Sequence, residues 1–199
     1  MARTEESNQR IRDEQKRKIL SVATRVFARK GLVGTKMTDI ATEAGIGYGL
    51  LYHYFSSKEL IFKAAVERAT LYGFQILIKR IQEQPGTPWE RLYQLTTIIL
   101  EGILREPEGF LLSQQAITSD AVPQEIKEMV WLHASQGIEE FQQLIIEGQT
   151  AGQVATGDSA ELANLYFACI GGIAMNFTNF RSPLSNYPKP ESVLRLLKA

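Results

Sequence analysis

The hydrophobic positions of this chain repeat with the period of α-helices along most of its length. The first such stripe lies within residues 12–30 and ends before Gly31; its apolar members are Ile19, Val22, Ala23, Val26 and Phe27. No stretch shows the sustained alternation of apolar and polar residues that marks a β-strand. The chain is therefore predicted to be all-α.

Capping residues and helix breakers divide the rest of the chain. Beyond the first helix and a pair of short helices, the predicted helices cover about 57–82, 88–105, 107–119, 123–150, 158–179 and 190–198, which makes nine in all. Thr87-Pro-Trp-Glu90 is the clearest start, because an N-cap residue, a proline at the first position and a glutamate at the third all fit one helix end. Ser56-x-x-Glu59 and Asp158-x-x-Glu161 are predicted to open two further helices.

The pair of short helices lies within about 37–56 and is joined at Gly45. Thr38 is predicted to cap the first of them, and Gly45 to end it where a left-handed residue is needed. The inward side of the pair is predicted to consist of Ile40, Ala41, Ala44, Ile46, Leu51 and Phe55. Such a pair is typical of the helix-turn-helix unit, whose second helix enters the major groove of DNA.

A set of motifs without gaps covers residues 12–65: Ile19-Leu-Ser-Val-Ala-Thr-Arg-Val-Phe27, Gly31, Thr38-Asp-Ile-Ala41, Ala44-Gly45, Gly49, Leu51-Tyr-His-Tyr-Phe55 and Ser57-Lys-Glu59. In these motifs the chain resembles the TetR family of bacterial transcriptional regulators. The resemblance implies a nine-helix architecture, with a three-helix DNA-binding domain over 1–57 and a larger helical effector-binding and dimerisation domain over 58–199.

The second helix of the pair has an unusual composition for a helix that reads bases. It holds no Arg, Lys, Asn or Gln, the side chains that make bidentate base contacts. The resemblance implies that Gly47 and Tyr48 stand where relatives often carry Ser and Lys, so we expect readout by shape and apolar contact. The predicted DNA-facing residues are Lys36, Thr38, Tyr48, Gly49, Leu50, Tyr52, His53 and Lys58.

Several of these basic and aromatic residues also have a purely structural interpretation. Lys36 could be a solvated loop charge, and Tyr52 could pack in the core. Ahead of the first helix, Arg3, Arg10 and Arg12 could form a basic arm that reaches the minor groove, or a frayed tail.

The net charge of zero conceals a division along the chain. Residues 1–68 hold 13 Lys/Arg and 8 Asp/Glu, a net of +5, whereas residues 69–199 hold 9 and 14, a net of −5. A basic first part suits attraction to phosphates. The chain has no apolar run near the ~18 residues of a membrane span, and its first residues lack the apolar core of a signal peptide. Cys169 is its single cysteine, so no disulfide can form within the chain. We therefore expect a bacterial cytoplasmic protein that has no membrane partner.

The predicted helices after residue 57 carry more apolar residues than one buried stripe each needs, among them Leu71, Phe74, Leu77, Ile78, Leu92, Leu95, Ile99 and Ile103. Most are expected to be plain core, while the resemblance implies that some line an effector pocket. The predicted ligand-binding residues are Phe74, Phe110, Gln114, Met129, Leu132, His133 and Gln136. The wall composition favours a small apolar or amphipathic effector.

One apolar stripe in the 158–179 helix is predicted to form a homodimer interface: Leu162, Leu165, Tyr166, Cys169, Ile170, Ile173 and Phe177. A twofold dimer is favoured because it reads two half-sites of a palindromic operator. The alternative is that the stripe packs inside its own bundle. Cys169 has no Lys or Arg within ten residues, so it is interpreted as a core residue and not as a redox sensor.

No arrangement of residues in the sequence indicates a catalytic, metal or cofactor site. The two histidines and one cysteine lie far apart, and no carboxylate or nucleophile near His53 could use it as a base. The sequence therefore predicts a dimeric, ligand-responsive DNA-binding regulator, a repressor that releases a double-stranded operator when a small effector binds. An activator of the same family, an enzyme and a helical protein-interaction module are the alternatives.

Overall fold

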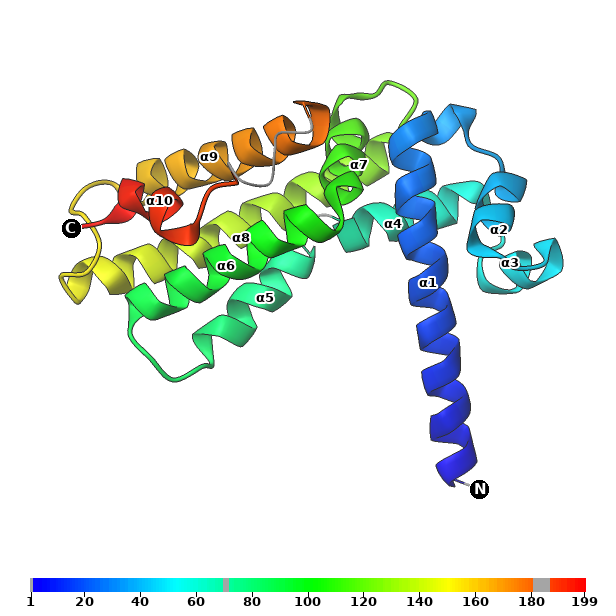
Figure 1. Ribbon diagram of the computed structural model, residues 1–199, viewed down its shortest axis with the longest axis horizontal. Helices are drawn as coiled ribbons and strands as arrows, with labels where there is room; N and C mark the ends of the chain where they lie inside the picture. Colours follow the sequence, from blue (N-terminus) through cyan, green and yellow to red (C-terminus); the bar gives the residue numbers. More distant parts are fainter. Residues whose placement is uncertain (1, 70–71, 181–186) are drawn as a thin grey trace.

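The computed structural model describes residues 2–69, 72–180 and 187–199, and the side chains of 5–69, 76–178 and 187–199. These residues form helices and one isolated β-bridge, between Val154 and Lys198, which confirms the all-α prediction. The helices are α1 Ala2–Gly34, α2 Met37–Ala44, α3 Tyr48–Tyr54, α4 Lys58–Ala69, α5 Tyr72–Gln82, α6 Pro88–Arg105, α7 Pro107–Thr118, α8 Gln124–Thr150, α9 Ser159–Phe180, α10 Pro190–Leu194 and a short 3₁₀ turn Arg195–Leu197. In Figure 1, α1 to α4 lie at one end, α5, α6, α8, α9 and α10 form the bundle at the other, and α7 lies between them.

Two predicted helix bounds are wrong. The helix predicted over 57–82 is α4 and α5, so the described residues hold ten helices where nine are predicted. The two parts belong to different cores, since Phe62 and Val66 pack in the first and Ile78 packs in the second. The helix predicted from residue 12 begins at Ala2 and kinks at Gly31 (φ 69°), so Arg3, Arg10 and Arg12 lie on a helix that projects from the body (Figure 1).

Two helix starts lie where the sequence predicts them, at Thr87 and Asp158, and in both a side chain caps the helix. The hydroxyl of Thr87 accepts from the Glu90 N–H at 3.3 Å while the Glu90 carboxylate accepts from the Thr87 N–H at 2.8 Å, as predicted. Asp158 accepts from the N–H groups of Ala160 and Glu161, at 2.7 and 3.1 Å.

Two of the predicted caps are wrong by one or two residues. Helix α2 begins at Met37, so Thr38 lies inside it, and the flanking residue is Lys36, whose N–H donates to Asp39 at 3.0 Å. Helix α4 begins at Lys58, and the hydroxyl that accepts from the Leu60 N–H, at 3.2 Å, is that of Ser57 and not Ser56.

Two hydrophobic cores hold the molecule together. The first joins α1, α2, α3 and α4 and extends into α7 and the start of α8, through Leu112, Ala116, Ile126 and Val130. The second joins α5, α6, α8, α9 and α10. The first core therefore crosses the domain boundary proposed at residues 57 and 58. A shift of α4 or α7 acts directly on the packing of the three N-terminal helices.

We expect Gly148→Ala to destabilise the protein. A Cβ at Gly148 would lie 2.4 Å from Val154 Cγ2, and overpacking of this kind costs about 1–3 kcal/mol, more than the ~1 kcal/mol by which Ala outranks Gly in a helix. Gly102→Ala is the matched control, because nothing lies within 4 Å of a Cβ there and the change should be neutral or stabilising. Urea unfolding measures both, and Val154→Ala should rescue Gly148→Ala. A midpoint for Gly148→Ala at or above that of the native protein would contradict the close approach.

Candidate nucleic-acid interface and ligand cavity

The turn between α2 and α3 is fixed by Gly45. This residue adopts the left-handed conformation at φ 66°, and the N–H groups of Gly45 and Ile46 donate to the carbonyls of Thr42 and Ala41 at 3.1 and 3.0 Å. A residue with a side chain would be strained at this φ. As predicted, the inward residues of the pair are buried, namely Ile40, Ala41, Ala44, Leu51 and Phe55, and Ile46 packs partly against them.

The outer face of α3 is exposed, with an exposed fraction of 50% for Tyr48, 44% for Leu50 and 40% for Tyr52. The Tyr48 hydroxyl donates to the Tyr52 hydroxyl at 3.1 Å, and the two ring centroids lie 4.7 Å apart. This hydrogen bond is the main reason why the pKa of Tyr52 lies above its ordinary value. Tyr52 is therefore a surface residue, and the interpretation of it as core is wrong. His53 and Gly49 are exposed beside them.

Two lysines and a threonine flank this face. Lys36 and Thr38 are exposed at the start of α2, and Lys58 is half-buried at the start of α4. Among the residues that the structure describes, neither lysine forms an ion pair.

Three other cations on this side of the domain, Arg25, Arg29 and Lys30, are paired with acidic neighbours. Glu43 pairs with Arg25 at 3.6 Å and with Arg29, and Asp39 pairs with Lys30 at 3.1 Å. The Lys36 N–H and the Lys30 ammonium lower the pKa of Asp39. Within the described part of the chain, the cations beside α3 that form no ion pair include Lys36, Lys58 and Lys16, whose ammonium lies 5.8 Å from the ring centroid of Phe55 at the end of α3.

A cavity of about 480 Å³ lies where the two cores meet, a volume within the usual range for small-molecule sites. Its wall draws on α1 and on α4 to α9, and is largely apolar: Ala69, Leu77, Ile99, Gly102, Ile103, Gly109, Phe110, Ile117, Val130, Ala134, Phe167, Ile170 and Gly171. Four residues with polar side chains complete it, Thr24, Arg68, Glu106 and Ser113. An apolar wall with few polar groups suits an apolar or amphipathic ligand.

The cavity includes one of the predicted ligand-binding residues, Phe110. Of the others, Gln114, Leu132 and Gln136 are exposed, Met129 packs against the first core, and His133 is half-buried outside the wall. The side chain of Phe74 lies outside the described residues. The charged wall residues Arg68 and Glu106 are not predictable from the sequence, because nothing local distinguishes them from solvated charges at helix ends.

The predicted dimer stripe of α9 faces mostly inward. Tyr166 is fully buried, with its hydroxyl 3.0 Å from that of Thr96 and its ring stacked on Phe141 at 4.5 Å, so its assignment to a dimer interface is wrong. The stripe residues that pack against the second core are Leu162, Cys169, Ile170 and Ile173, and Phe177 contacts Tyr187. The alternative interpretation therefore holds for these residues: they are buried against the other helices of their own bundle, as the apolar stripe of a helix usually is. Leu165 is exposed, on a different face with Ala168, Gly172 and Met175.

The single cysteine, Cys169, is also partly buried, and this burial raises the pKa of its thiol. Within the described parts of the chain, no three His, Cys, Asp or Glu side chains are grouped closely enough to hold a metal ion. No helix there has the length and apolar character needed to cross a membrane.

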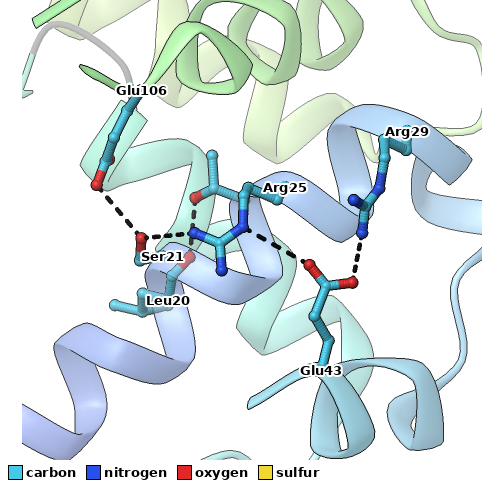
Figure 2. A network of polar contacts seen from close by, with 7 residues as sticks. Leu20, Ser21, Arg25, Arg29, Glu43 and Glu106 are labelled. Atoms are coloured by element: carbon cyan, nitrogen blue, oxygen red, sulfur yellow. Dashed lines mark hydrogen bonds and ion pairs between the residues drawn. The ribbon is translucent and has the colours of Figure 1, made fainter.

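A chain of polar contacts joins the cavity wall to the helix-turn-helix (Figure 2). The Ser21 hydroxyl donates to Glu106 at 3.3 Å and accepts from Arg25 at 3.4 Å. Arg25 in turn pairs with Glu43 of α2. The wall of the cavity is thus linked through α1 to a helix of the DNA-binding unit.

An exposed helix on a buried helix-turn-helix scaffold, joined to a helical bundle with an apolar cavity, is the arrangement of a helix-turn-helix transcriptional regulator. Residues 19–65 match the family model described as bacterial regulatory proteins, tetR family. YfiR, an HTH-type transcriptional regulator of Bacillus subtilis (strain 168), is 33% identical over 92 residues, which cover 46% of this chain and 44% of YfiR. The chain thus spans less than half the length of that relative.

Two further proteins match over most of their length. The HTH-type transcriptional repressor DhaR of Mycobacterium sp. (strain GP1) is 25% identical over 85% of this chain and 86% of DhaR. The TetR family transcriptional regulator PfmR of Thermus thermophilus superposes with a TM-score of 0.68 at 22% identity, over 89% of this chain and 92% of PfmR. These relatives are named for transcriptional regulation and not for catalysis. Residues 19–65 of this chain are thus similar to the TetR family of bacterial regulators.

Proposed function

We propose that this protein is a transcriptional repressor that binds a palindromic operator as a homodimer and releases it when a small molecule enters the cavity. The observation that carries the proposal is the exposed face of α3, which stands on a buried scaffold beside Lys36 and Lys58, two lysines without an ion pair among the described residues. Such a role places the protein in the bacterial cytoplasm, where the DNA is.

The reading of DNA falls to aromatic and apolar groups. Tyr48 and Tyr52 each present a phenol hydroxyl that can donate to a base edge or a phosphate, and Leu50 can pack on a thymine methyl group. Lys36, Thr38 and Lys58 are the proposed phosphate contacts, and Gly49 lets the backbone of α3 approach the duplex. We expect the operator preference to rest largely on groove shape, because the helix offers few bidentate hydrogen-bonding groups.

A second copy of the chain completes the reading unit. Two recognition helices must lie about 34–36 Å apart to enter successive major grooves. The proposed contact surface is the exposed face of α9, with Leu165, Ala168, Gly172 and Met175. Small residues on this face allow the two helices to approach closely.

The proposed release mechanism is a shift in population between two arrangements of the helices. The cavity wall includes Arg68 and Ala69 at the end of α4 and Thr24 of α1, and both helices belong to the first core. An occupant that favours a different position of α4 changes the spacing of the two recognition helices. An activator with the same fold would differ only in the sign of this coupling.

We expect Tyr48→Ala to weaken operator binding several-fold, up to about tenfold, because a single hydrogen bond contributes about 0.5–1.5 kcal/mol. Tyr93→Ala is the matched control, since Tyr93 is also an exposed tyrosine on a helix, bonded to Glu191 at 2.8 Å in the other part of the protein. Fluorescence anisotropy with an operator selected from random duplexes measures both variants, along with Lys58→Ala. Unchanged affinity in both Tyr48→Ala and Lys58→Ala would refute the proposed DNA interface.

A further inference from the structure

One ion pair stands out in the largely apolar cavity wall. The Arg68 guanidinium donates to the Glu106 carboxylate and, at 3.2 Å, to the backbone carbonyl of Arg17. The side chain of Arg68 has an exposed fraction of 30% and that of Glu106 of 51%. A charge beside an apolar cavity is costly when it is left unpaired. A ligand in the cavity must therefore leave this ion pair intact or take the place of one of its members.

The two members of the pair are not equally free to leave it. Arg68 is held by α1 through the Arg17 carbonyl, and it is the less exposed of the two. Glu106 also lines a second cavity of about 160 Å³, whose wall contains Arg25 and Arg105. The Glu106 carboxylate can therefore turn away from Arg68 and find other cations, whereas Arg68 would lose its one carboxylate partner among the described residues.

We infer that the cavity takes an amphipathic carboxylate whose head group replaces Glu106 on Arg68 while its apolar tail fills the wall beyond. This inference rests on the effector role proposed above for the cavity and names the class of effector. A guanidinium binds a carboxylate through two parallel N–H donors, a geometry that a neutral or cationic head group cannot reproduce. A cationic head would have to take Glu106 away from Arg68 and would leave the guanidinium with a carbonyl alone.

The same exchange acts on the DNA-binding unit. When Glu106 leaves Arg68, its position as the acceptor of the Ser21 hydroxyl changes. A carboxylate that turns into the second cavity approaches Arg25, which otherwise pairs with Glu43 of α2 at 3.6 Å. Glu106 then competes with Glu43 for Arg25, and the contact between α1 and α2 weakens.

The test is a calorimetric titration of the full chain with decanoate, decan-1-ol and decyltrimethylammonium. We expect decanoate to bind about tenfold or more tightly than decan-1-ol, the difference between a charged and a neutral hydrogen bond. Arg68→Gln should remove this preference and leave the affinity for decan-1-ol unchanged. Glu106→Gln should raise the affinity for decanoate several-fold, because no carboxylate then competes for Arg68. Lys63→Gln is the control, since Lys63 is another cation of α4, paired with Glu125 at 2.8 Å away from the cavity wall.

Equal binding of decanoate and decan-1-ol, tightest binding of the cation, or no gain in Glu106→Gln would each overturn the inference. The Glu106→Gln arm decides it even if Arg68→Gln fails to fold. Hydrogen exchange in Met37–Ala44 should rise when decanoate binds, and unchanged exchange would overturn the link to α2. None of these measurements uses DNA. A protein that binds its operator without an Arg68-dependent preference refutes this inference alone, and one that binds decanoate through Arg68 but no DNA refutes the proposed function.

Discussion

Raising the salt concentration from about 50 to about 200 mM is expected to weaken operator binding about 100-fold. The reason is the release of counterions from the DNA when lysines replace them at the phosphates. Lys36 and Lys58 supply two such cations from each protomer, hence four from a dimer, which gives a slope of about −3.6 for the logarithm of affinity against the logarithm of salt. Anisotropy titrations at four or five salt concentrations measure this slope directly.

Substitution of one lysine sharpens the same measurement. Lys58→Gln removes two cations from each dimer, so the slope should become shallower by about 2 while the ranking of operator sequences stays the same. Lys189→Gln is the matched control, because Lys189 is an exposed lysine at the start of α10. Binding that hardly changes with salt, or a control with as large an effect as Lys58→Gln, would rule out phosphate contacts by these lysines.

Phe27→Ala is expected to lower the free energy of unfolding by about 3–5 kcal/mol, the usual cost of truncating a buried aromatic residue. Phe27 is fully buried in the first core, and its ring meets that of Phe62 edge to face with centroids 5.0 Å apart. For a chain of this size, the loss corresponds to a fall in melting temperature of about 10 °C. Val33→Ala should change stability by less than about 0.5 kcal/mol, because Val33 lies on the same helix with 75% of its surface exposed.

The same variant tests whether the first core is shared between the two ends of the molecule. Both tryptophans, Trp89 and Trp131, lie outside the first three helices. If the N-terminal helices unfold together with α7 and α8, circular dichroism and tryptophan fluorescence should report the same midpoint in Phe27→Ala. Two separated transitions would show that the N-terminal helices unfold as an independent unit, against the shared core.

The local features of this chain follow from its sequence. Apolar spacing gives the helices, and Gly45 gives the turn between α2 and α3, because both depend on residues only a few positions apart. The same holds for the caps at Thr87 and Asp158, whose partners lie within three residues. The buried scaffold of the helix-turn-helix and the family resemblance therefore emerge before any tertiary contact is known.

Only the tertiary structure decided which aromatic residues are buried and which charged residues meet at the cavity, because the residues in contact are far apart in the chain. Tyr52 is exposed and Tyr166 is buried, although both are aromatic residues on amphipathic helices; only the position of each helix on its neighbours separates them. Arg68 and Glu106 are 38 positions apart, and no periodicity or cap signals that they meet at a cavity wall. The helix-turn-helix could thus be predicted from sequence alone, whereas the cavity and its link to that unit could not.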